Sequence, residues 1–213
     1  MKKYFYKIRP WLLSKADNFR YSKEYYYTRI FHKYDRLEAY LALYRKCRTQ
    51  ESFKTASVIS FLDGLRSGAG IKEVVSMLPT VRHDILNNEA LPVKVVFYKM
   101  LIGEYRVKCH IHFFEGKMFL CSYTFSNLKE GDPEKITATL QKKYLPDVAG
   151  YSGQVIADPD GNCIYVEKGV ELSINYLSLQ DGMSTEMQRF CEEQERKQEK
   201  RVSAGETEVF NSL

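Results

Sequence analysis

Two histidines, His110 and His112, stand two residues apart in a segment where apolar and polar residues alternate. Alternate side chains of a strand point to the same face, so both imidazoles share one face, and such a pair can bind a metal ion. A zinc site needs further ligands, but no nearby acid or cysteine shares that face, because Cys109 points to the opposite side. We therefore predict no metal and no cofactor, and a polar sheet face that also carries Arg106 and Lys108.

Three oxygen-bearing side chains, Asp158, Asp160 and Asn162, occupy the first, third and fifth positions of a calcium-loop pattern. The rest of the pattern is missing, because Cys163 stands at the glycine position and Gly169 stands at the final glutamate position. The segment favours an ordinary hairpin turn.

Catalytic signatures are missing from the sequence. It contains no G-x-S-x-G, H-E-x-x-H or paired-carboxylate pattern, and no nucleophile signature surrounds its five cysteines. We predict no catalytic residue and a protein that is not an enzyme; an enzyme built from residues distant in sequence stays open as an alternative. An odd number of cysteines without a C-x-x-C pair favours reduced thiols in a cytoplasmic protein. The start of the chain lacks the apolar run of a secretory signal, and no window approaches about 18 apolar residues, so we expect no membrane segment.

Positive charge and aromatic residues concentrate near the start of the 213-residue chain. Residues 1–48 contain thirteen Lys or Arg against four Asp or Glu, together with thirteen aromatic residues. Bases interleaved with aromatics are typical of surfaces that bind RNA or single strands. An amphipathic helix over 22–48 explains the aromatic spacing as well, since its apolar residues step by three and four: Tyr27, Ile30, Tyr34, Leu37, Leu41 and Tyr44. The candidate nucleic-acid contacts on the remaining surface are Arg29, Lys33, Arg36, Arg45, Lys46 and Arg48.

Hydrophobic periodicity predicts the other elements. Helices are expected at 52–65 and 71–78. The period then changes to two, which predicts a first antiparallel meander with strands at 93–102, 105–113 and 117–125. A helix that Asp132 caps and Pro146 ends separates it from a second meander, with strands at 154–157, 162–167 and 170–177. A charged helix is expected from about Ser184, followed by a tail at 202–213.

Register decides between two loops after the second strand. A two-residue loop would place His110 beside Cys121, whereas a three-residue loop at 114–116 places Cys109 beside Cys121 and keeps apolar residues together. We predict the three-residue loop, with Gly116 in the left-handed conformation.

The stretch from Gly68 to Pro79 resembles the opening of the small helix-plus-sheet unit of the SmpA/BamE outer-membrane lipoproteins, which is doubled in beta-lactamase inhibitory proteins. Gly68, Val74 and Leu78 follow the spacing of that family, but the glycine expected after the leucine is absent, as are the signal sequence and the lipidated cysteine. The resemblance covers residues 68–127. It implies a noncatalytic scaffold whose sheet binds another protein.

We therefore predict an α+β protein in three parts: N-terminal helices at 1–66, tandem units of a helix and a three-strand antiparallel meander at 67–180, and a charged helix with a tail at 181–213. Its expected function is non-enzymatic: an adaptor, inhibitor or immunity-type protein that docks a protein partner. The expected docking face carries Arg106, Lys108, His110 and His112. The alternative is a nucleic-acid-binding accessory protein that uses the basic N-terminal helix.

Overall fold

The computed structural model describes residues 34, 36–62, 64–78, 84–87, 91–180, 182, 184–190, 192, 193 and 196. Within them the chain has the predicted α+β fold. The helices are α3 (Leu37–Thr49), α4 (Ile71–Met77) and α5 (Asp132–Tyr144), and residues 184–190 are also helical. The strands are β1 (Ser52–Lys54), β2 (Asp84–Asn87), β3 (Val93–Ile102), β4 (Tyr105–Phe114), β5 (Lys117–Phe125), β6 (Val155–Ala157), β7 (Asn162–Lys168) and β8 (Leu172–Ser178).

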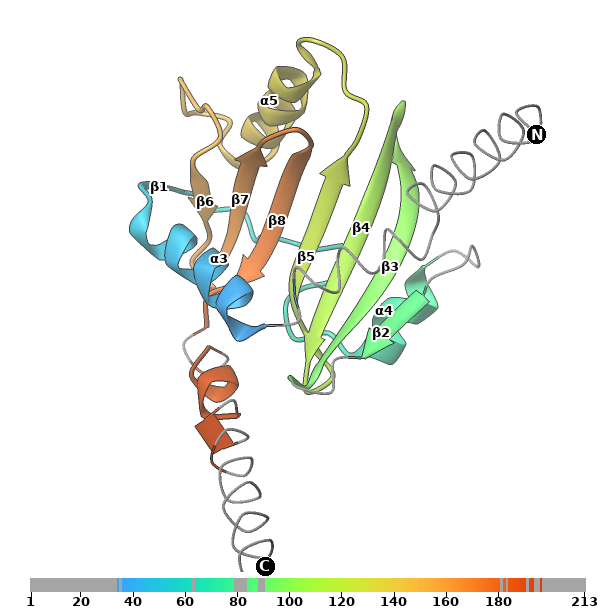
Figure 1. The fold of residues 1–213 in the computed structure, drawn as a ribbon. Coiled ribbons are helices and arrows are strands. Elements are labelled where there is room, and N and C mark those ends of the chain that lie inside the picture. Colours follow the sequence, from blue (N-terminus) through green and yellow to red (C-terminus); the bar gives the residue numbers. More distant parts are fainter. Residues whose placement is uncertain are drawn as a thin grey trace, which may run out of the picture.

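All eight strands form one sheet in the order β1-β6-β7-β8-β5-β4-β3-β2 (Figure 1). The strands of both predicted meanders are confirmed, and the two meanders join where β5 pairs antiparallel with β8. Every other pairing is antiparallel as well, except that β1 runs parallel to β6. The turns after β3 and after β7 therefore lie at the same end of the sheet.

A hydrophobic cluster covers each side of the sheet, and we call the two sides face A and face B. On face A, the predicted stripe of α5 is confirmed, since Ile136, Leu140 and Tyr144 are buried in one cluster together with Val74 of α4. On face B, α3 lies across the strands in front of the sheet in Figure 1 and buries Tyr40, Leu43, Tyr44 and Cys47. Met187 of the C-terminal helix joins this second cluster. Burial of one such side chain contributes about 1.5–3 kcal/mol, so both layers stabilise the sheet.

The predicted helix at 52–65 is wrong. Phe53 instead pairs with Ile156 as part of β1, and the backbone N–H of Thr55 continues the pairing to the carbonyl of Ala157 at 3.0 Å. The residues that follow form irregular backbone whose apolar side chains, Ile59, Phe61, Leu62 and Leu65, enter the face A cluster. The unpaired edge of β6 offered hydrogen bonds that outweighed the local helical periodicity.

The predicted first helix is confirmed over α3, and residues 22–33 and 35 lie outside the described residues. Its buried stripe differs from the predicted one. Leu37 and Leu41 are only partly buried, whereas Leu43 and Cys47 are buried beside Tyr44. The buried stripe is thus displaced around the helix axis by roughly a quarter of a turn from the predicted seam, since the helix presents residues 40, 43, 44 and 47 to the sheet.

The loop between β4 and β5 is shorter than predicted. Phe114 pairs with Lys117, so the turn contains only Glu115 and Gly116, with φ values of 48° and 80°. Two left-handed residues are typical of the tight hairpin turns that match strand twist. The left-handed Gly116 is confirmed, and the three-residue loop is wrong. A register shift between His112 and Phe113 then inserts one extra residue in β5 and brings apolar residues back to one face.

The starts of the two later helices are close to those predicted. Asp132 is the first helical residue of α5, and the capping position belongs to Gly131, whose φ is 82°. The predicted cap at Asp132 is therefore wrong by one position. The helix ends before Pro146, as predicted. Gly182 and residues 184–190 are helical, close to the predicted start near Ser184, and the predicted tail at 202–213 lies outside the described residues.

Candidate functional site

Strand register arranges the side chains of face B in rows that cross five strands. Directly paired residues on adjacent strands share a face, so each row runs perpendicular to the strands. The row nearest the β3–β4 turn is polar and contains Lys99, Lys108, Thr124, Ser173 and Glu167. The middle row contains Phe97, His110, Ser122, Asn175 and Tyr165. The innermost row is mostly apolar and contains Val95, His112, Leu120, Leu177 and Cys163.

His112 belongs to the apolar row and is fully buried, at 0% exposure. Its Nδ1 atom lies 3.1 Å from the hydroxyl of Tyr40, which α3 carries to the sheet. The rings of Tyr34 and Phe119 also contact the imidazole, with centroids 4.5 Å and 6.2 Å away. Burial, with a smaller contribution from Tyr34, raises the pKa of Tyr40 well above its usual value.

His110 lies in the middle row and is buried as well, at 3% exposure. Its ring packs against Phe97 with centroids 5.4 Å apart. Beside it, the Ser122 hydroxyl donates to Oδ1 of Asn175 at 2.6 Å, and the Asn175 amide donates to the carbonyl of Tyr165 at 3.4 Å. The prediction that both histidines belong to a docking surface is therefore wrong, because polar partners and aromatic packing occupy this part of the face.

The polar row keeps part of its side chains in solvent. Lys108 makes an ion pair with Glu171 at 3.1 Å, and Ser126 donates to the same carboxylate at 2.6 Å. At the other end of the row, Lys46 of α3 reaches Glu167 at 3.0 Å. This hydrogen bond is the main reason that the pKa of Lys46 is raised.

At the end of the β3–β4 ribbon, Arg106 and Lys108 of the predicted docking face lie beside Lys99 and Leu101; Arg106 is exposed and Lys108 is partly buried. Lys99 is paired directly with Lys108, and Leu101 is paired directly with Arg106. Leu101 is 68% exposed, and Lys99 and Arg106 are exposed and make no ion pair with any described residue. We call Lys99, Leu101, Arg106 and Lys108 the ribbon patch. Like charges in directly opposed positions destabilise a sheet, so the Lys99–Lys108 pair has a cost to the fold.

Sequence reasoning missed Lys99 and Leu101, although the signal was present. A two-residue turn at Gly103 and Glu104 fixes the pairing of the strands on either side of it. That pairing places Leu101 opposite Arg106 and Lys99 opposite Lys108, as observed.

The predicted nucleic-acid ridge is only partly described. Arg29 and Lys33 lie outside the described residues. Arg36 precedes α3 and is exposed, as are Arg45 and Arg48. The Arg48 guanidinium donates to the carbonyl of Leu179 at 3.4 Å, and Lys46 is engaged by Glu167 as described above.

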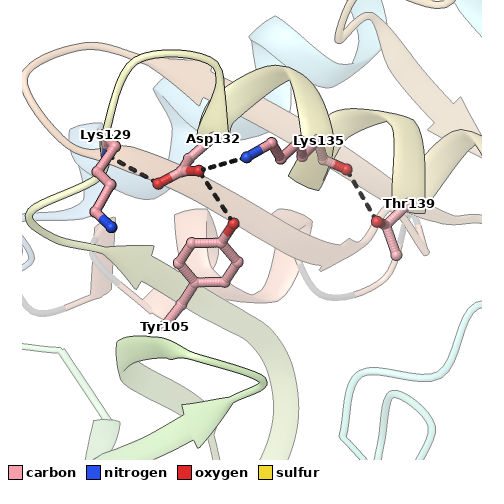
Figure 2. Close-up of polar contacts among 5 residues, drawn as sticks. All are labelled: Tyr105, Lys129, Asp132, Lys135 and Thr139. Carbon is pink, nitrogen blue, oxygen red and sulfur yellow. Dashed lines mark hydrogen bonds and ion pairs between the residues drawn. The ribbon is translucent and has the colours of Figure 1, made fainter.

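Asp132 gathers three donors at the start of α5 (Figure 2). One carboxylate oxygen accepts the backbone N–H of Lys129 at 2.9 Å, and the other accepts the Tyr105 hydroxyl and the Lys135 ammonium, both at 3.3 Å. These donors, the Lys129 amide foremost, hold the pKa of Asp132 below its usual value. Since Tyr105 begins β4, the contacts tie β4 to the start of α5, and the group has a structural role.

Asp158 is saturated in a similar way. Its carboxylate accepts the backbone N–H groups of Asn162 at 2.8 Å and Ile59 at 2.9 Å, and the side-chain amide of Asn162 at 3.0 Å. Asp160 is exposed at the tip of the same turn. The predicted turn is confirmed, and Asp158 anchors to it the irregular segment that follows β1. Among the described residues, no group of three or more His, Cys, Asp or Glu side chains is placed to hold a metal ion.

No family model, curated protein or solved structure matches this chain. The resemblance to the SmpA/BamE unit stays a prediction. None of the helices in the described part of the chain combines the length and the apolar character needed to span a bilayer.

Proposed function

We propose that this chain is a non-enzymatic protein of the adaptor, inhibitor or immunity type, and that the ribbon patch binds an acidic protein partner. The observation that supports this proposal most directly is exposed Leu101 opposite Arg106, next to the opposed pair of Lys99 and Lys108. A single exposed leucine is ordinary on a protein surface. Its combination with three cations on one ribbon suits a partner that offers carboxylates around an apolar contact.

The cost of the Lys99–Lys108 pair strengthens the proposal. Glu171 neutralises Lys108 in part, but no described residue makes an ion pair with Lys99. A partner carboxylate placed over Lys99 would relieve this repulsion on binding. Outside the ribbon patch, residues of types that often act in catalysis make structural hydrogen bonds: His112 bonds to Tyr40, and Asp158 bonds to Asn162. This division of roles favours binding over catalysis.

The proposal can be tested by site-specific photo-cross-linking in the cell that produces the protein. A benzophenone amino acid replaces Leu101 in the full chain, and a matched protein carries it at Thr139, which is exposed on α5. We expect a discrete protein adduct from position 101 and none from position 139. The partner's cross-linked peptide should carry a net negative charge, and the double change Lys99→Glu with Arg106→Glu should reduce the adduct at least about tenfold.

The control for charge is Lys72→Glu with Lys142→Glu, two exposed lysines on α4 and α5 away from the ribbon patch. This control should leave the adduct from position 101 unchanged. Equal yields from positions 101 and 139, or an adduct that survives charge reversal of the ribbon patch, would reject the proposed surface. An adduct that ribonuclease destroys would instead support the nucleic-acid alternative.

The proposed compartment is the cytoplasm, as the sequence predicts. Support comes from the cysteines Cys47, Cys109, Cys121 and Cys163, which are all free and buried. Free thiols are the usual state in a reducing compartment.

A further inference from the structure

Two cysteines on neighbouring strands have their sulfur atoms in contact. The Sγ atoms of Cys109 on β4 and Cys121 on β5 lie 3.6 Å apart. They are diagonal neighbours on face A, because Cys109 pairs directly with Tyr123 and Ile111 pairs directly with Cys121. A disulfide bond needs a separation of about 2.05 Å, so the sulfurs must approach by about 1.5 Å. This contact exists because the register shift in β5 places both cysteines on the apolar side of the sheet.

We propose that Cys109 and Cys121 form a disulfide when the chain folds in the presence of a disulfide oxidant such as oxidised glutathione, and that the finished fold then preserves whichever state was made. This inference is independent of the proposed binding function. It also goes beyond the prediction from the odd number of cysteines, since four of the five are buried in the described part of the chain and two of them touch.

The chemistry is two successive thiol–disulfide exchanges. The thiol of Cys121 or Cys109 loses a proton and attacks oxidised glutathione, which forms a mixed disulfide and releases one glutathione thiolate. The second cysteine then loses its proton and attacks the protein sulfur of the mixed disulfide, which releases the second glutathione. The two cysteines together lose two protons and two electrons, and one oxidised glutathione becomes two reduced molecules.

Burial determines when this exchange can occur. Cys109 and Cys121 are both 0% exposed, so a tripeptide disulfide has no access to either sulfur once the sheet is covered. Tyr123 helps to close the site, because its hydroxyl donates to the carbonyl of Phe61 at 2.6 Å and fixes the segment that covers this face. The hydrogen bond to Cys121 and burial also raise the pKa of Cys109, which disfavours the reactive thiolate. Exchange must therefore precede final packing.

The experiment is cell-free synthesis of the full chain in two buffers, one with reduced and one with oxidised glutathione. Remaining thiols are alkylated under denaturing conditions, and the protein is digested with trypsin. Cleavage at Lys108, Lys117 and Lys129 separates the two cysteines into neighbouring peptides, 109–117 and 118–129. We expect these peptides joined by a disulfide after oxidising synthesis and separate after reducing synthesis. When oxidised glutathione is added to the finished reduced protein, both cysteines should stay alkylatable after denaturation.

Two variants keep the result specific. Cys109→Ala should abolish the joined peptides, while Cys163→Ala, a buried cysteine on β7, should leave them unchanged. The cross-linked protein should also melt about 5–10 °C higher than the reduced protein, because the bond restricts the unfolded chain. Separate peptides after oxidising synthesis, or a cross-link that joins Cys47 to Cys163 only, would overturn the proposed pair. If the finished reduced protein forms the disulfide as fast as the chain does during oxidising synthesis, the proposal that the fold preserves the thiol state is wrong.

Discussion

The hydroxyl of Tyr40 lies 3.1 Å from Nδ1 of His112, and this hydrogen bond joins α3 to the centre of the sheet. Both residues are 0% exposed, so neither polar group can turn to water instead. Since buried polar groups need partners, the bond fixes where the helix rests on β4. The strand face that the sequence predicts to be uniformly polar is thereby divided. Its inner half carries a helix, and its outer half carries the ribbon patch.

Removal of the Tyr40 hydroxyl should therefore destabilise the protein. We expect Tyr40→Phe to lower the free energy of unfolding by about 1–2 kcal/mol, because Nδ1 of His112 loses a partner in a site closed to water. Urea denaturation followed by circular dichroism measures this difference. The slope of the unfolding free energy against urea should not change, since the compactness of the fold is retained.

The matched control for this change is Tyr44→Phe in the same helix. The Tyr44 hydroxyl is buried and has no hydrogen-bond partner among the described residues. Its loss should leave the stability unchanged or raise it slightly, because an unsatisfied buried hydroxyl is itself unfavourable. If both variants lose the same free energy, ring packing and not the Tyr40–His112 bond explains the effect.

Alternation predicted the strands that carry the ribbon patch. In β4, the odd residues from Tyr105 to Phe113 are mainly apolar and the even ones are polar, and this pattern is legible without tertiary information. The glycine at position 103 marked the turn before β4, which fixes the register of β3 against it. The outer half of face B could therefore be predicted from the sequence, and so could the pairing of Leu101 with Arg106.

Longer-range contacts were beyond sequence pattern alone. Ile59 and Leu62 are spaced as in a helix, but their segment is held by Asp158, which lies about a hundred residues away in the chain and accepts the N–H of Ile59. The burial of His110 and His112 depends on which face α3 covers, and alternation within β4 does not contain that information. The register shift at Phe113 likewise arises from packing of β5 against its neighbours.

The anchoring role of Asp158 gives a second prediction. Asp158→Ala should lower the free energy of unfolding by about 2–4 kcal/mol, because the N–H groups of Ile59 and Asn162 lose a charged acceptor in a buried site. Thermal and urea unfolding both measure the loss. Asp160→Ala, which removes an exposed carboxylate from the same turn, should change stability by less than about 0.5 kcal/mol. A large loss for both would mean that turn conformation, and not the anchor, sets the stability.

The lowered pKa of Asp132 predicts a pH dependence. A carboxyl group stabilises the fold when its pKa is lower in the folded than in the unfolded chain. The stabilisation is complete at pH values above the unfolded pKa of about 3.9, and it is lost as the pH falls through the folded pKa. Wild type should therefore exceed Asp132→Asn in unfolding free energy at pH 7, and the gap should narrow as the pH falls below about 4. Urea titrations at each pH measure the gap. If the difference in unfolding free energy between wild type and Asp132→Asn does not change with pH, lost packing and not the carboxylate charge explains the effect of the variant.

Removal of the charge repulsion between Lys99 and Lys108 should raise the stability of the fold and weaken binding of the partner. We expect Lys99→Thr to raise the free energy of unfolding by about 0.3 kcal/mol at low salt, because the like-charge pair is removed and threonine suits a strand. The gain from charge should fade at about 1 M salt, where screening is strong. Lys94→Thr on the same strand is the control, since its paired residue is Phe113 and no like charge opposes it. The same Lys99→Thr protein should give a weaker partner adduct from a photo-cross-linker at position 101. A variant that is more stable and binds the partner less well would show that the Lys99 ammonium contributes to binding at a cost in stability. Unchanged binding would show that Lys99 does not contact the partner.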